Sequence, residues 1–248
     1  GSGSSHSVTG NFIGGSAPEC GGSALEKSNS SNNNFNGISI NGNANESYIQ
    51  GNAIRNINWS NSGQSTFYGI LAENSNVSIG TVAGNSIGAS DATGSITFTA
   101  GGAGSLFRGI ALLGNRQITL TGNSVGGITL NNQPSGDTDF NGIFCNTSAT
   151  TLIKGNLIGS STVPNSIQQT SVSNGSGNAQ MCFGIYSTAT GSVTIDSNTI
   201  ANLSNGASTS STYVTGSVRG IYTTAGTNSI LFNTVRNLIF YGRSASTN

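Results

Sequence analysis

The sequence predicts an all-β fold: a right-handed parallel β-helix, or β-solenoid, of about seven coils with a two-coil repeat of about 74 residues. Two short motifs alternate along the whole chain without exception, and apolar residues recur at fixed positions around them. Short runs with apolar and polar residues in alternation are separated by Gly and Asn, and helical periodicity is lacking. These three observations indicate stacked coils of short strands.

The first motif is an Asn followed two residues later by Ile or Val. Its asparagines are Asn11, Asn52, Asn85, Asn123, Asn156, Asn198 and Asn233. The residue three positions before each Asn is also apolar: Val8, Ile49, Val82, Leu120, Ile153, Ile195 and Ile230. We expect these apolar residues to form an inward column. We expect the Asn side chains to form a ladder that hydrogen-bonds each coil to the next.

The second motif is a Gly-Ile pair that usually follows an aromatic residue, as in FNGI, FYGI and FRGI. Coils in which the first motif continues as NFIGGS, NSIGAS or NLIGSS have a long connector, and the coils between them have a shorter one. Long connectors such as SDATGSITFTAGGAGS are therefore expected to project from alternate coils as a ridge along one edge.

The repeat extends over residues 1–248, which we interpret as a single β-helix segment. Core positions begin at Val8 and the last connector is incomplete, with no capping helix or polar terminal coil, so we expect the segment to be part of a longer array. Residues 1–7, rich in Gly and Ser, are interpreted as a tag or a flexible start.

The composition narrows the functional classes. Only 6% of residues are charged, and eight Lys and Arg balance eight Asp and Glu. A neutral chain without a basic stripe argues against nucleic-acid partners, and the lack of a long apolar run argues against membrane insertion. Cys20, Cys145 and Cys182 lack the spacing of a metal site; for Cys145 and Cys182 we expect free, buried thiols.

The stretches GNFIGGS, SIQGNAI, FYGI, GNSIGASDATGSITF and FRGI resemble the β-helix repeats of very large Bacteroidota surface proteins. The resemblance covers nearly the whole chain. It implies export by the type IX system, an extracellular location at the cell surface, and a role as an adhesin or filament protein. The repeat is specific for the fold and only weakly specific for the function.

Parallel β-helices also carry polysaccharide lyases and hydrolases, which need paired carboxylates or a base with a cation. Asp196 has Lys154 as its expected neighbour one coil earlier, so an outward ion pair is predicted. Asp137 and Asp139 are expected to cap the backbone of a turn, since the further ligands of a calcium loop are missing. His6 is the only histidine. We therefore expect no enzyme, no catalytic residue, no metal and no cofactor.

One surface feature favours binding. Phe144, Tyr186 and Tyr222 are expected to point outward in one column, flanked by Phe183 and Arg219. An exposed aromatic strip suits sugar rings or a second copy of the chain, unless connectors fold over it.

The predicted function is thus a stiff structural or adhesive rod in an extracellular filament or adhesin. The predicted partners are identical chains, in a homo-oligomer or filament, and surface glycans. A carbohydrate-binding module or polysaccharide-active β-helix is the alternative. Ice binding is a minor alternative, suggested by T-x-T patterns in SITFTA and QITLTG.

Overall fold

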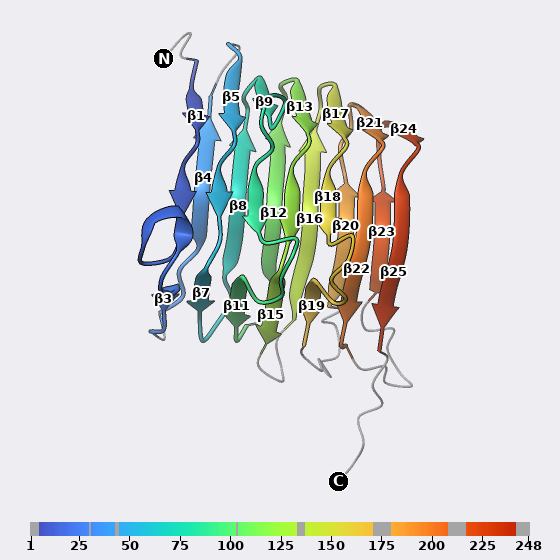
Figure 1. Cartoon of the computed structure of the whole chain (residues 1–248). Helices are drawn as coiled ribbons and strands as arrows, with labels where there is room; N and C mark the ends of the chain where they lie inside the picture. Colours follow the sequence, from blue (N-terminus) through green and yellow to red (C-terminus); the bar gives the residue numbers. More distant parts are fainter. Residues whose placement is uncertain are drawn as a thin grey trace.

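The protein is a parallel β-solenoid in the computed structural model, which describes residues 5–29, 31–42, 45–102, 104–132, 137–170, 180–207 and 217–241, without the side chain of residue 132. Strands from successive coils lie side by side in each sheet, and the coils stack along one axis (Figure 1). Apart from one 3-10 turn, η1 (Pro18–Cys20), the elements of these ranges are β-strands. None of these elements is a helix long and apolar enough to cross a membrane.

Two of the three sheets take at most one strand from each coil. The first sheet contains β1 (Ser7–Thr9), β5 (Ser47–Gln50), β9 (Val77–Ile79), β13 (Ile118–Thr121), β17 (Thr151–Lys154), β21 (Ser192–Asp196) and β24 (Thr227–Leu231). The third sheet contains β4 (Phe35–Asn41), β8 (Thr66–Glu73), β12 (Ser105–Gly114), β16 (Thr138–Thr147), β20 (Met181–Ser187) and β23 (Ser217–Thr223).

The second sheet has two halves that meet at a corner. One half contains β2 (Phe12–Ile13), β6 (Ala53–Ile54), β10 (Ser86–Gly88), β14 (Ser124–Gly126) and β18 (Leu157–Gly159). The other contains β3 (Leu25–Lys27), β7 (Ile57–Ser60), β11 (Ile96–Ala100), β15 (Ile128–Asn132) and β19 (Ile167–Gln169). β22 (Thr199–Asn205) and β25 (Thr234–Phe240) run through the corner. Within the described ranges the last coil has no strand of the third sheet, so the number of complete coils is slightly below the seven predicted.

The core consists of stacked columns, one residue per coil. Ile49, Ile79, Leu120, Ile153 and Ile195 pair in register in the first sheet and are fully buried. The prediction that Val82 belongs to this column is wrong: Val82 is 90% exposed, and Ile79 occupies the column position instead. The corner after β9 is longer by three residues than the other corners, which shifts the register. The Gln50 side chain braces this longer corner by accepting from the backbone N–H groups of Val82 and Ala83.

The two sequence motifs meet inside the solenoid. A Cβ added to Gly109 would lie 2.6 Å from Cγ1 of Val125, the apolar residue of the first motif, and 2.6 Å from the carbonyl oxygen of Gly142 in the next coil. Real Cβ atoms do not approach other atoms so closely, so this position requires Gly. The glycine of the second motif thus makes room for the apolar residue of the first.

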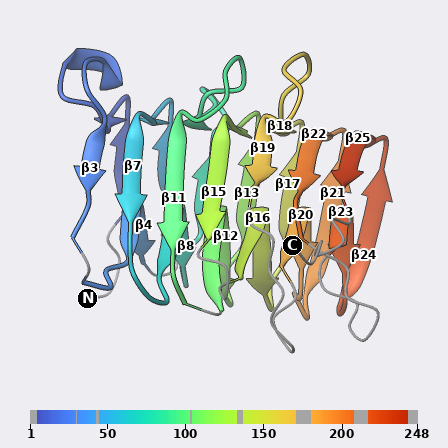
Figure 2. The same ribbon diagram turned by 90° about the horizontal axis from the view of Figure 1, so that it is seen from below.

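The predicted alternation of coils is visible as three loops on one side of the solenoid, at residues 14–24, 89–95 and 160–166 (Figure 2). The intervening coils turn the same corner with a single residue of positive φ, such as Asn56 or Asn202. These corner residues also hold the loops: Asn56 Nδ2 donates to the carbonyl oxygen of Cys20 at 2.9 Å, and Asn202 Nδ2 to that of Ser160 at 2.8 Å. The loops are shorter than predicted, because Ile96–Ala100 of the long connector forms the core strand β11.

The start of the chain joins the first coil. Ser7 begins β1 and pairs with Tyr48 of β5, whereas residues 1–4 of the region predicted as a tag or flexible start lie outside the described residues.

Candidate functional site

The predicted asparagine ladder is continuous along the solenoid. Each side-chain oxygen accepts two hydrogen bonds from the preceding Asn, one from its backbone N–H and one from its Nδ2, at 2.8–3.0 Å. All seven predicted members take part: Asn11, Asn52, Asn85, Asn123, Asn156, Asn198 and Asn233.

Each inner Asn also reaches back to the previous coil. Asn85 Nδ2, for example, donates to the carbonyl oxygen of Ile49 at 2.9 Å, and Asn123 Nδ2 donates to that of Ile79 at 3.1 Å. The five inner members, from Asn52 to Asn198, are at most 2% exposed. One side chain therefore joins three coils in a water-excluded position, where a lost partner is costly. The ladder therefore couples successive coils along the axis in addition to the backbone hydrogen bonds of the sheets.

The second candidate site, which we call the aromatic strip, lies on the outer face of the third sheet. It consists of the five predicted residues Phe144, Phe183, Tyr186, Arg219 and Tyr222. In register, Phe144 pairs with Tyr186, which pairs with Tyr222, and Phe183 pairs with Arg219. The ring centroids of Tyr186 and Tyr222 are 5.3 Å apart with an angle of 21° between the ring planes. The structure thus brings all five residues together.

The strip is less exposed than predicted. Phe144 is only 7% exposed and Phe183 only 5%, whereas Tyr186, Arg219 and Tyr222 are half-buried. The Arg108 guanidinium lies 3.7 Å from the Phe144 ring centroid and covers that ring. Phe183 is enclosed by Tyr186, Tyr222 and Arg219, at 4.9, 5.5 and 5.6 Å from its ring centroid. The ring faces are therefore largely used within the strip.

Arg108 was missed in the sequence and belongs to this surface. It occupies the variable position of the second motif, FRGI, as do Phe183 and Arg219 in their coils. Its Nη1 lies 3.3 Å from the Tyr68 hydroxyl oxygen, and its buried Nε has no hydrogen-bond partner. Desolvation lowers the pKa of Arg108. The available signal was the position of Arg in the motif, which places it in the same column as Phe183 and Arg219.

Asp137, just before β16, and Asp139 within it bind backbone N–H groups of neighbouring coils, whereas the prediction had them cap the backbone of their own turn. Asp137 Oδ1 accepts from the backbone N–H of Gly104 in the previous coil at 2.6 Å, and Asp139 Oδ1 accepts from that of Met181 in the next coil at 2.8 Å. Burial raises the pKa of Asp139 to about 6, although the Met181 N–H and the Arg108 charge favour its ionised form. Together these two residues connect three coils beside the aromatic strip.

The ion pair predicted between Lys154 and Asp196 is present. Lys154 pairs with Asp196 in register, and Lys154 Nζ lies 2.7 Å from Asp196 Oδ2. Hydrogen bonds from Lys154 and Ser197 hold the pKa of Asp196 below its usual range. Asp196 is thus explained by its partner on the outer face of the first sheet.

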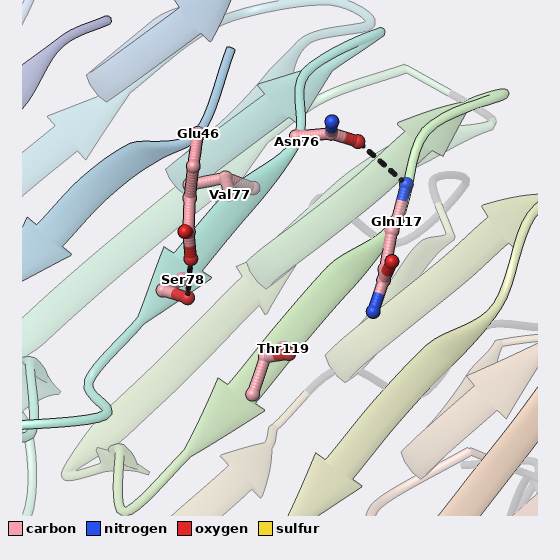
Figure 3. Close-up of a pocket in the computed structure, with 6 residues that line it drawn as sticks. All are labelled: Glu46, Asn76, Val77, Ser78, Gln117 and Thr119. Carbon is pink, nitrogen blue, oxygen red and sulfur yellow. Dashed lines mark hydrogen bonds between the residues drawn. The ribbon is translucent and has the colours of Figure 1, made fainter. Parts of the chain in front are cut away.

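A small pocket opens on the first sheet, between the ends of β5, β9 and β13 (Figure 3). Its volume is about 150 Å³, and it is lined by Glu46, Asn76, Val77, Ser78, Gln117 and Thr119. The Glu46 carboxylate accepts from the Ser78 hydroxyl at 2.6 Å and from the Tyr48 phenol at 3.1 Å, which raises the pKa of Tyr48. The pocket holds a single carboxylate, already engaged by two donors, so it does not offer an acid and base pair.

The strand pairing also places the cysteines and the T-x-T patterns singled out in the sequence. The three cysteines are buried and free, since Cys145 faces Ser187, and Cys182 faces Phe140. The two T-x-T patterns lie on different sheets, one in β11 and the other in β13, so they do not form one flat row. Across the described ranges, no group of three His, Cys, Asp or Glu side chains is arranged to hold a metal ion.

Comparison with protein-family models, with curated proteins and with solved structures finds no match to this chain.

Proposed function

We propose that this chain is a stiff rod segment of an extracellular surface protein, serving in a filament or adhesin. The observation that carries the proposal is the asparagine ladder, whose hydrogen bonds run without a break from Asn11 to Asn233. Each coil needs only its neighbours for burial, so a solenoid of this kind can extend to any length at constant cross-section. The resemblance to Bacteroidota surface repeats supports export by the type IX system and a location at the cell surface.

The neutral composition supports lateral or end-to-end association of identical rods. With eight cationic and eight anionic side chains, long-range repulsion between copies is small. Homo-oligomers or filaments of this chain are therefore part of the proposal.

Force spectroscopy tests the mechanical part of the proposal. The chain would be placed between two reference domains of known unfolding force and pulled from its ends. We expect it to resist extension and then to unfold in steps of coil size. The variant Asn123→Ala should lower the unfolding force, whereas Arg116→Gln, a change of a half-buried side chain away from the ladder, should leave it unchanged. A chain that extends without a force peak would contradict the proposal.

A carbohydrate-binding module is the second candidate function, and the aromatic strip is the observation that favours it. Two half-buried tyrosines and an arginine on a rigid sheet are groups that sugars use. A glycan array combined with a reducing-sugar assay separates the candidates. Binding without turnover supports the module, turnover supports an enzyme, and neither outcome is expected for a purely mechanical rod.

A further inference from the structure

The groups that the aromatic strip leaves unpaired are hydrogen-bond donors and a cation. Among the described residues, the hydroxyls of Tyr186 and Tyr222 have no hydrogen-bond partner. Arg219 has no carboxylate partner there either, since the ion pair found in the described ranges is Lys154–Asp196. Arg219 lies over the Tyr222 ring, 4.1 Å from its centroid. A guanidinium fork and phenol hydroxyls recognise carboxylate or sulfate oxygens.

The geometry of the rings argues against sugar stacking. Tyr186 and Tyr222 stack on one another, and Arg108 and Arg219 lie over Phe144 and Tyr222. The ring faces, which carry negative potential and would contact the C–H groups of a neutral sugar, are therefore occupied. What remains toward solvent is the ring edges, which carry positive potential. The strip and its neighbour Arg108 thus present two guanidinium groups on a chain with no net charge, with Asp139 close to Arg108.

The strip is also linear and regularly spaced. The centroids from Phe144 to Tyr186 and from Tyr186 to Tyr222 are 5.5 and 5.3 Å apart along the solenoid axis. Arg108 and Arg219 lie on strands separated by three coil steps, roughly 14 Å at the usual spacing of parallel strands. An extended polymer with an anionic group on successive units would place charges against both guanidinium groups.

We infer that the aromatic strip binds an acidic polysaccharide lengthwise, with Arg219 holding a carboxylate or sulfate group and the hydroxyls of Tyr186 and Tyr222 donating to neighbouring oxygens. Arg108 is the second cationic contact, nearer the N-terminal end, and its charge is partly opposed by Asp139. The inference rests on the proposed role of the chain in an adhesin. It specifies acidic polysaccharides as the ligand class for the carbohydrate-binding function proposed as the second candidate.

The test is isothermal titration of the purified chain with polygalacturonate, heparin, neutral dextran and polyglutamate. We expect binding to at least one acidic polysaccharide, weakening as salt rises, and no binding to dextran. Polygalacturonate against heparin distinguishes a carboxylate from a sulfate ligand. Among galacturonate oligomers, affinity for the protein should rise with oligomer length until one oligomer is long enough to contact both guanidinium groups.

Variants locate the site. Arg219→Gln should weaken binding at least about tenfold, because a charge-assisted hydrogen bond is lost. Tyr222→Phe removes only a hydroxyl and should weaken binding severalfold without changing the fold. Arg116→Gln, which removes a half-buried arginine outside the strip, is the matched control and should bind as the parent does. Circular dichroism and the Tm verify that each variant is folded.

The inference would be overturned by a lack of binding to either acidic polysaccharide, by equal binding to dextran, or by an equal loss of affinity in the Arg116→Gln control. Binding to polyglutamate as tight as to the polysaccharides would instead identify an acidic protein partner and also overturn it. None of these results changes the pulling experiment, so failure of the inference is distinguishable from failure of the rod proposal.

Discussion

Replacing one inner Asn of the ladder tests the structural argument most directly. Asn123→Ala removes the oxygen that accepts from Asn85 N and Asn85 Nδ2 at 3.0 and 2.8 Å. It also removes the Nδ2 that donates to the carbonyl oxygen of Ile79 and to Asn156 Oδ1. The change leaves two buried donors on Asn85 without this acceptor, and water does not reach them because Asn85 is 1% exposed.

The magnitude follows from the cost of unpaired buried donors. Each buried donor without a partner costs about 1–3 kcal/mol, so two cost about 2–6 kcal/mol of unfolding free energy. Asn11→Ala should cost less, because Asn11 is exposed and accepts from no described Asn, so its removal leaves no buried donor without an acceptor. Thr121→Ala, on the outer side of the neighbouring strand β13, is the control and should change stability by less than about 0.5 kcal/mol.

Urea unfolding followed by circular dichroism measures these differences. Because solenoids can unfold in parts, amide hydrogen exchange at Asn85 should be recorded as well. We expect its protection to fall in Asn123→Ala and to stay unchanged in Thr121→Ala. A loss of less than about 1 kcal/mol in Asn123→Ala, with Asn85 still protected, would refute the view that the ladder couples the coils.

Two further predictions concern a glycine and a carboxylate. Gly109→Ala should lower the unfolding free energy by about 1–3 kcal/mol, because the added methyl group would overpack against Val125. Gly155→Ala, at a position with open space around it and a φ of 63°, should cost about 1–2 kcal/mol through backbone strain alone. Equal thermal stability of the parent and Gly109→Ala would argue against the packing account. Burial raises the pKa of Asp139 from 3.8 to about 6, so the folded state binds a proton more readily than the unfolded state. The unfolding free energy should therefore rise by up to about 3 kcal/mol as pH falls from 7 to 4, and Asp139→Asn should remove this rise in urea titrations at each pH.

Much of the fold could be predicted because inward positions are specified repeatedly. Each coil places Ile, Val or Leu in the same columns, so the register of the fold remains clear even where the prediction for one coil is wrong. The asparagines were equally clear, since an amide at a water-excluded corner must bond to its neighbours, and the same geometry recurs in every coil. Local insertions were not predictable in this way: three extra residues before Asn85 moved Val82 to the surface, and only the strand pairing of Ile79 revealed it.

The outward columns were only half predictable. Alternation gave the direction of Phe144, Tyr186 and Tyr222 correctly, because direction depends on the backbone alone. Their exposure depends on which long side chain lies over them, and a motif does not specify that. Arg108 is three columns along the strand from its own Ala111 and covers Phe144 of the next coil by extending its guanidinium across the coil boundary. A surface on this scaffold is therefore set by neighbours in adjacent coils. A binding site built there should be altered by one substitution without disturbing the core beneath it.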